Sequence, residues 1–176
     1  ISFLIIFLFF LLRSNFKKFF GLIYIFLPFV ILIQLRNDEN FFEILTFIVL
    51  FAVTTDVSSY FFGNFFGGMK LAPKISPGKT ISGSIGGVII PLLICILFYS
   101  KNTDILYVGI SSIIFSIFVQ IGDLVESYFK RSCFVKDSSN LIPGHGGILD
   151  RFDGIFLLII IVYLLKILDF NFFFIV

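Results

Sequence analysis

The sequence predicts an all-α fold: a polytopic integral membrane bundle of about six helical spans. Of its 176 residues, 59% are hydrophobic and only 14% are charged, whereas a soluble domain carries about 25% charged residues to cover its surface. The mean hydropathy is +1.10. The apolar residues are gathered in near-continuous runs, several of which approach the about 20 residues that a helix needs to cross a bilayer.

Six such runs follow one another along the chain, at 1–12, 19–35, 41–62, 81–99, 105–122 and 154–174. We expect each to be a helix, because a helix satisfies its own backbone hydrogen bonds in lipid. The first run is short and the chain opens on Ile1 instead of Met, so we expect further residues before it in the complete protein. The connections are short and polar, which predicts a single transmembrane domain over 1–176.

Basic residues predict the orientation of these spans. The connections after the first, third and fifth runs hold ten of the 13 Lys and Arg residues: Arg13, Lys17, Lys18, Lys70, Lys74, Lys79, Lys130, Arg131, Lys136 and Arg151. The other two connections hold only Arg36 and Lys101. Since basic loops stay in the cytoplasm, the polar loops at 63–80 and 123–153 are expected to share the cytoplasmic face. The two cysteines, Cys95 and Cys133, form no CxxC pair and indicate neither a zinc knuckle nor a disulfide framework.

The most polar stretch of the chain runs from Asp123 to Asp153. Asp123, Glu126 and Lys130 are spaced to share a helix face. Asp150 and Asp153 lie three residues apart at the start of the last run, where a helix N-terminus favours negative charge. Clustered carboxylates repel one another unless a cation lies among them, and ligands that are all oxygen suit magnesium or calcium. The stretch therefore predicts a metal site.

The loop between these carboxylates predicts a phosphate site. It reads LIPGHGG over 141–147 and contains His145, the only histidine. Glycine backbone beside a helix start can turn its N–H groups toward a phosphate. Four basic residues flank this loop in the sequence and are expected to supply further anion contacts: Lys130, Arg131, Lys136 and Arg151. A hard cation, a phosphate cradle and a basic rim together indicate phosphoryl or nucleotidyl transfer. For His145 alone, a loop position with no special task is an equally good interpretation.

The loop that follows the third run is a second candidate wall of the site. The fragment from Ser76 to Thr80 reads SPGKT. It is not a Walker A loop, because Pro73 occupies the position of the first glycine and no strand is expected before it. We expect Thr80 to cap the next helix and Lys79 to meet an anion. Asp56 is an acid within a run and is by default a functional candidate, although it could instead pair with a lysine. Three glycines, Gly83, Gly86 and Gly87, are expected to let helices pack closely.

The motifs together resemble those of the phosphatidate cytidylyltransferases, the CDP-diacylglycerol synthases. The match keeps every spacing of SYFKR from Ser127, of Lys136–Asp137, of IPGHGG from Ile142, and of DRFD from Asp150 to Asp153. The segment GDLVES before it and the upstream Asp56, Tyr60, Gly63 and SPGKT positions are similar too. One departure is Ser82, where that family often carries another polar or acidic residue.

The resemblance implies that CTP and phosphatidate react to give CDP-diacylglycerol and pyrophosphate, with Mg²⁺ as cofactor. It implies catalytic and metal-binding roles for Asp123, Asp150 and Asp153, and a weaker catalytic role for His145 at a phosphate or the leaving group. The substrate phosphates would be held by Ser76, Lys79, Lys130, Arg131, Lys136 and Arg151. The expected location is a bacterial inner (plasma) membrane with the active site facing the cytoplasm.

Other functions fit less well. A CDP-alcohol phosphatidyltransferase would need Ala-Arg after a DGxx pattern, but Ile155 and Phe156 follow Asp153–Gly154. A membrane transporter predicts internal repeats and mid-span charges, and neither is evident; an inactive copy would not be expected to retain the spacing. A related CTP-dependent lipid or prenol kinase stays open. Besides CTP, phosphatidate and membrane lipid, we expect no nucleic acid partner, and a homodimer stays open.

Overall fold

The computed structural model describes residues 16–98, 104–135, 137–139, 147 and 149–168. The helices are α2 (Phe16–Leu35), α3 (Phe41–Phe66), α4 (Ile81–Leu97), α5 (Ile105–Ser132) and α6 (Asp153–Ile167), with a 3₁₀ turn, η1 (Leu149–Arg151). Two short strands, β1 (Lys70–Ala72) and β2 (Ser76–Thr80), lie between α3 and α4. The helical fold predicted from the sequence is therefore confirmed for the described residues, while the run at 1–12 lies outside them.

Two helices run further than their apolar stretches. α3 extends to Phe66 and α5 to Ser132, so the helix expected to continue past Gly122 does carry Asp123, Glu126 and Lys130. By length and composition, α3 and α5 are each able to cross a membrane, and α2 and α4 contain shorter apolar helices. This is compatible with a membrane protein; the count of six spans stays a prediction.

A β-hairpin stands where the sequence predicted only a loop. β1 and β2 pair antiparallel, with Lys70 opposite Thr80. The chain leaves α3 through Gly67 and Gly68, whose φ angles of 59° and 101° favour glycine. The Ile81 N–H then donates to the Met69 carbonyl at 2.9 Å. The hairpin therefore leads directly into α4 and fixes where the residues of SPGKT lie.

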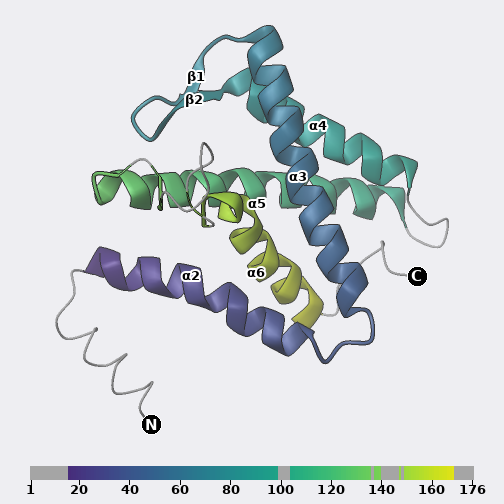
Figure 1. Cartoon of the computed structure of the whole chain (residues 1–176). Helices are drawn as coiled ribbons and strands as arrows, with labels where there is room; N and C mark the ends of the chain where they lie inside the picture. Colours follow the sequence, from purple (N-terminus) through teal and green to yellow (C-terminus); the bar gives the residue numbers. More distant parts are fainter. Residues whose placement is uncertain (1–15, 99–103, 136, 140–146, 148, 169–176) are drawn as a thin grey trace.

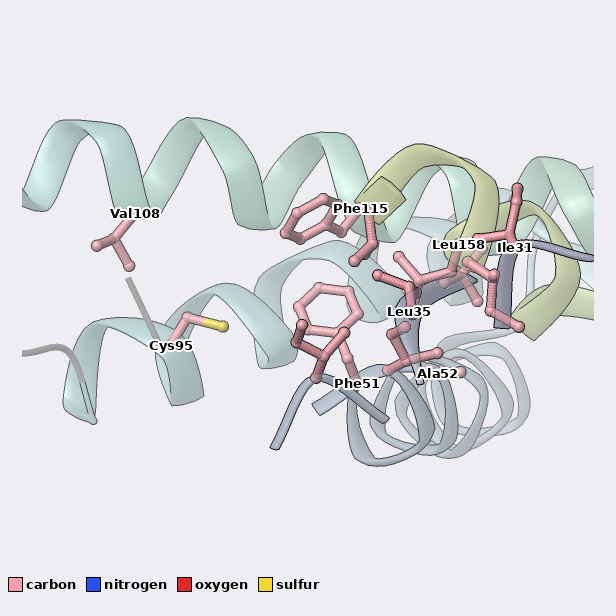
Figure 2. Packing of buried hydrophobic residues seen from close by; sticks show 13 residues of the cluster. Ile31, Leu35, Phe51, Ala52, Cys95, Val108, Phe115 and Leu158 are labelled. Carbon is pink, nitrogen blue, oxygen red and sulfur yellow. The ribbon is translucent and has the colours of Figure 1, made fainter. Parts of the chain in front are cut away.

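The core takes apolar side chains from all five described α-helices, and Figure 2 shows how they pack. Phe115 of α5 and Leu158 of α6 are fully buried, and Phe51 of α3 packs edge-on against Phe115 with ring centroids 5.8 Å apart. α2 packs against α6, and α4 lies against α3 and α5 (Figure 1). Burial of these apolar side chains holds together the helix ends that carry the polar residues.

The three glycines at the start of α4 do allow close packing against α3. A Cβ on Gly83 would lie 2.6 Å from the Ser59 carbonyl oxygen, and one on Gly86 would overlap the Phe62 ring. A Cβ on Gly87 would overlap the Ser59 hydroxyl. The prediction of a glycine-mediated helix contact is thus confirmed.

Candidate active site at the ends of α3, α5 and α6

A cavity of about 340 Å³ opens beside the hairpin. It is lined by residues of α3, the hairpin, α4 and α5: Asp56, Ser59, Tyr60, Gly63, Asn64, Leu71, Gly78, Lys79, Thr80, Gly83, Ser84, Gln120 and Asp123. Segments far apart in the sequence thus meet around one space. Residues of the segment over 63–80 and Asp123, the first residue of the stretch over 123–153, thus line a single pocket.

Two of the lining residues, Lys79 and Asp123, form an ion pair. Lys79 comes from β2 and Asp123 from α5, and their side chains are 25% and 21% exposed. The second oxygen of Asp123 lies 3.4 Å from the Ser127 hydroxyl, one helical turn further on. The expected anion contact of Lys79 is therefore made, in this structure, by a carboxylate of the protein itself.

Hydroxyl groups hold the strand that carries Lys79. Thr80 is the N-cap of α4, and its hydroxyl accepts a hydrogen bond of 3.1 Å from the Gly83 N–H, as the sequence predicted. The Ser82 hydroxyl lies 3.1 Å from that of Thr80 and donates to the Gly67 carbonyl. Ser82 is the residue that departs from the resemblance, and here it ties the start of α4 to the end of α3.

Asp56 and Gln120 belong to the same cavity. Asp56 lies within electrostatic range of Asp123, Asp153 and Lys79, so it belongs to a cluster of charges from four elements. The sequence did not predict Gln120, whose amide exchanges hydrogen bonds with the hydroxyl and carbonyl of Ser84. Its signal was a lone amide in an apolar run, three residues before Asp123.

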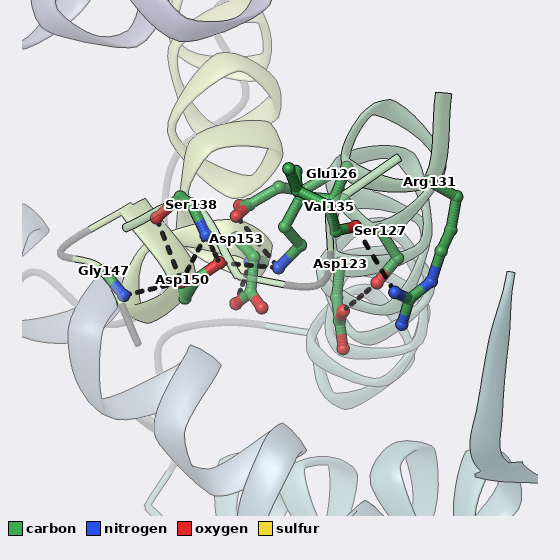
Figure 3. A network of polar contacts seen from close by, with 12 residues as sticks. Asp123, Glu126, Ser127, Arg131, Val135, Ser138, Gly147, Asp150 and Asp153 are labelled. Carbon is green, nitrogen blue, oxygen red and sulfur yellow. Dashed lines mark hydrogen bonds and ion pairs between the residues drawn. The ribbon is translucent and has the colours of Figure 1, made fainter. Parts of the chain in front are cut away.

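Asp150 is the most heavily hydrogen-bonded carboxylate of the described residues, as Figure 3 shows. One oxygen lies 2.8 Å from Lys130 Nζ. The other accepts bonds of 2.7 Å from the Gly147 N–H, 2.9 Å from the Ser138 N–H and 3.0 Å from the Ser138 hydroxyl. Burial by itself would raise the pKa of the Asp150 carboxyl, but the bonds from Lys130, Gly147 and Ser138 hold that pKa well below its usual range. Asp150 therefore stays ionised and joins Ser138 and Gly147 to Lys130 of α5.

Lys130 joins this network to α5. Its Nζ also lies 3.3 Å from Glu126 Oε1, although neither oxygen of the buried Glu126 makes a hydrogen bond within the described part of the chain. Asp153, the first residue of α6, accepts a 2.9 Å bond from the Gly154 N–H. It lies in electrostatic range of Asp123, Lys130 and Lys79. Asp153 therefore lies near charges of the cavity and near Lys130 of the network around Asp150.

The remaining predicted site residues are placed less completely. Arg131 donates to the carbonyls of Ile75 and Val135, both at 3.3 Å, and so ties the end of α5 to the hairpin. Ser76 begins β2 and is not among the residues that line the cavity. Lys136 and His145 lie outside the described residues, and of Arg151 only the backbone, in η1, is described.

The residues that line the cavity include carboxylates, Asp56 and Asp123, whose oxygens are of the type that magnesium prefers. Magnesium is usually held by one or two carboxylates together with substrate phosphates, and Asp123 lines the cavity. As the side chains stand, no group of three acidic, histidine or cysteine residues within the described ranges is arranged to hold a metal. Asp123 is paired with Lys79, and Asp150 with Lys130. Metal ligation by Asp123, Asp150 and Asp153 therefore stays a prediction.

The fold and the cavity define a helical protein with membrane-capable helices and a charged pocket at the helix ends. The family model described as "Cytidylyltransferase family" matches residues 1–168, and the chain belongs to that family. It is 46% identical over 134 residues to a phosphatidate cytidylyltransferase of Staphylococcus haemolyticus, covering 74% of this chain and 51% of that protein.

Two further relatives carry the same name. A Bacillus subtilis protein is 41% identical over 149 residues, covering 81% of this chain and 55% of that protein. A Rickettsia conorii protein is 40% identical over 158 residues, covering 84% of this chain and 68% of that protein. The chain thus spans about half the length of the Staphylococcus and Bacillus relatives.

Proposed function

We propose that the protein is a phosphatidate cytidylyltransferase, which converts CTP and phosphatidate into CDP-diacylglycerol and pyrophosphate. The observation that carries the proposal is the cavity in which Lys79 of the hairpin meets Asp123 of α5, beside Asp153 and Asp56. Family membership and the shared name of the relatives support it.

The reaction needs positioning and charge neutralisation more than a protein nucleophile. A phosphate oxygen of phosphatidate attacks the α-phosphorus of CTP, the bond to the β-phosphate breaks, and pyrophosphate leaves with its electron pair. The attacking oxygen is already anionic, so no covalent enzyme intermediate is required. Lys79 would leave Asp123 for the triphosphate, because preorganised cations stabilise the charge that develops there. Lys130 and the other basic residues of 130–151 would hold the remaining phosphate charge.

Asp123, Asp150 and Asp153 are the proposed ligands of Mg²⁺. When bound, the ion would neutralise phosphate charge and orient the triphosphate. For Asp123 and Asp150 this requires that they exchange a lysine partner for the ion, a change that arriving phosphates favour because they attract the lysines. Asp153, in the first turn of α6, would be the third ligand of the ion.

The proposed topology has six spans in this chain, with the loops over 63–80 and 123–153 in the cytoplasm of a bacterial inner membrane. It is supported by the alternation of basic loops in the sequence. In this arrangement phosphatidate reaches the site laterally from the bilayer and CTP reaches it from the cytoplasm. A site at the boundary between the two phases then serves both substrates.

The direct test is product formation by membranes that contain the full-length protein. Incubation with CTP, phosphatidate and Mg²⁺ should yield CDP-diacylglycerol, detected by mass spectrometry. Asp123→Asn should lower the rate by about two orders of magnitude or more, because it removes a group that positions charge in the transition state. Absence of product from the full-length protein, or release of CDP with a phosphorylated lipid, would reject the proposed reaction.

Metal removal tests the cofactor separately. EDTA should abolish product formation, and excess Mg²⁺ should restore it, because the triphosphate charge would otherwise stay unneutralised. Prior titration of EDTA with Ca²⁺ is a control for chelation of trace metals. Activity that is indifferent to chelation would remove the metal from the proposal while leaving the reaction in place.

A further inference from the structure

Two glycines, Gly122 and Gly154, lie in close contacts between α5 and α6. A Cβ on Gly122 would lie 3.0 Å from the Asp153 carbonyl oxygen, and a Cβ on Gly154 would lie 2.8 Å from Val119 Cγ1. Each glycine is the chain neighbour of a site carboxylate: Gly122 precedes Asp123, and Gly154 follows Asp153. The geometry of this crossing therefore sets the separation of the two carboxylates.

Tyr24 of α2 reaches into the crossing from a third helix. Its hydroxyl lies 3.2 Å from the Gly122 carbonyl oxygen and 3.2 Å from the Asp153 carbonyl oxygen. A hydroxyl has a single proton to donate, so the two carbonyls share it. The ring is held by Phe129 of α5 and Phe156 of α6, with centroids 6.3 and 6.2 Å away. The Tyr24 hydroxyl thus bridges α5 and α6. On α5 it contacts Gly122, the neighbour of Asp123, and on α6 it contacts the backbone of Asp153 itself.

We infer that Tyr24 is a positioning residue: through the Gly122 and Asp153 carbonyls its hydroxyl keeps Asp123 and Asp153 at the spacing that nucleotidyl transfer requires. The inference rests on the proposed function. Tyr24 need not touch either substrate to do this. Transfer between two bound phosphates depends steeply on placement, and an error of about 1 Å can cost about 100-fold in rate.

A second tyrosine separates this role from ordinary helix packing. Tyr163 also joins α2 to α6, but at the far end of α6 from Asp153. Its hydroxyl donates to Gln34 of α2 at 2.6 Å. Both tyrosines therefore join α2 to α6 through one hydroxyl, but only Tyr24 does so beside the carboxylates. If Tyr24 only helped the helices to pack, loss of either tyrosine hydroxyl would change kcat to a similar extent.

The experiment compares Tyr24→Phe with Tyr163→Phe in the full-length protein. Each variant deletes one oxygen and keeps the ring. We expect kcat of Tyr24→Phe to fall about tenfold, with KM for CTP changed by less than about twofold, whereas Tyr163→Phe keeps both values within about twofold. Hydrogen exchange supplies a second measurement that does not depend on turnover. Peptides that cover 119–126 should exchange faster in Tyr24→Phe and be unchanged in Tyr163→Phe.

The outcomes are distinct from those of the proposed reaction. An active wild type with undiminished kcat in Tyr24→Phe would overturn the inference alone. Equal losses of kcat in the two tyrosine variants would do so as well, because they would show a general effect of helix docking. A fall in kcat of Tyr24→Phe without faster exchange over 119–126 would also count against positioning. A wild type that makes no CDP-diacylglycerol would reject the proposed function on which the inference rests.

Discussion

In the cavity, the ion pair between Lys79 and Asp123 occupies two charged groups that the proposed reaction would need for phosphate and metal. Both side chains are only about a quarter exposed, so neither is fully solvated, and each is the other's ion-pair partner. An arriving triphosphate offers Lys79 a stronger partner than one carboxylate does. The same event would free Asp123 for another cation. The pair is therefore a resting arrangement that substrate binding is expected to break.

Replacement of Lys79 tests this at the residue scale. Lys79→Gln should raise KM for CTP by about tenfold or more, because one charged contact with a phosphate is lost. Lys74→Gln is the matched control, since Lys74 is an exposed lysine in the turn of the same hairpin; its kinetic constants should match those of the wild type. Equal effects of the two substitutions would show a general charge effect and would contradict a specific role for Lys79.

The lowered pKa of Asp150 predicts that the stability of the folded protein depends on pH. Its pKa in the folded protein lies well below the unfolded value of about 3.9. Its stabilising contribution is therefore complete above about pH 4 and is lost as the pH falls through the folded-state pKa. Asp150→Asn leaves Lys130 with a lost partner and should lower the free energy of unfolding at pH 7 by about 3 kcal/mol. Denaturant unfolding in detergent at a series of pH values measures it. The gap between wild type and variant should narrow below about pH 4, and a constant gap would contradict the assignment.

At the scale of whole elements, the contact between α3 and α4 determines where the hairpin lies. The first two turns of α4 pack closely on α3, because Gly83, Gly86 and Gly87 carry no side chains there. Thr80 caps this end of α4 and Lys79 precedes it. Any displacement of α4 away from α3 would thus move Lys79 relative to Asp123.

A methyl group at this contact tests the arrangement. Gly83→Ala should destabilise the protein by about 1–3 kcal/mol, because the new Cβ would lie 2.6 Å from a backbone oxygen that cannot move aside easily. Gly109→Ala is the control. Its Cβ would make an ordinary 3.8 Å contact with Leu92, so it should be neutral or stabilise α5 by up to about 1 kcal/mol. Thermal unfolding in detergent compares the two, and equal stability of both variants would contradict the close packing of α3 and α4.

At the scale of the whole molecule, the polar loops are expected to share one side of a membrane. The hairpin and the end of α5 are tied together by Arg131 and Ile75, so their placement on a common side is built into the described structure. Which side that is depends on the basic residues of the loops, since lysine and arginine favour the cytoplasm.

Cys133 provides a native reporter of this orientation. It is exposed at the end of α5, whereas Cys95 is buried. A membrane-impermeant maleimide should label Cys133 in inverted membrane vesicles and leave it unlabelled in intact cells. Cys133→Ser should abolish the signal, which controls for other thiols. Labelling in intact cells but not in inverted vesicles would reverse the proposed topology.

The helical character and the chemistry of the site could be predicted without coordinates, for local reasons. Long apolar runs predict helices wherever backbone groups must be satisfied internally. α2 and α4 follow that prediction closely, whereas α3 and α5 extend past their apolar runs. The spacing from Asp123 to Asp153 and the SPGKT fragment singled out two segments, and Lys79 and Asp123 from these segments line one cavity. The capping role of Thr80 and the close contact at Gly83 also followed from residue type alone.

Long-range geometry required the folded chain. The sequence did not predict the hairpin, because the pairing of β1 with β2 depends on the turn at Gly67 and Gly68 after α3. No periodicity of apolar residues indicates that turn. The partners of Lys79, Lys130 and Asp150 come from other elements, so the sequence could name these charges but not pair them. Tyr24 looked like one more aromatic residue in an apolar run, and only the crossing of α5 and α6 gave its hydroxyl two carbonyls. The sequence by itself determined which residues carry charge and which segments are helical, because both are local properties; tertiary packing decided which charges meet, because that depends on contacts between distant segments.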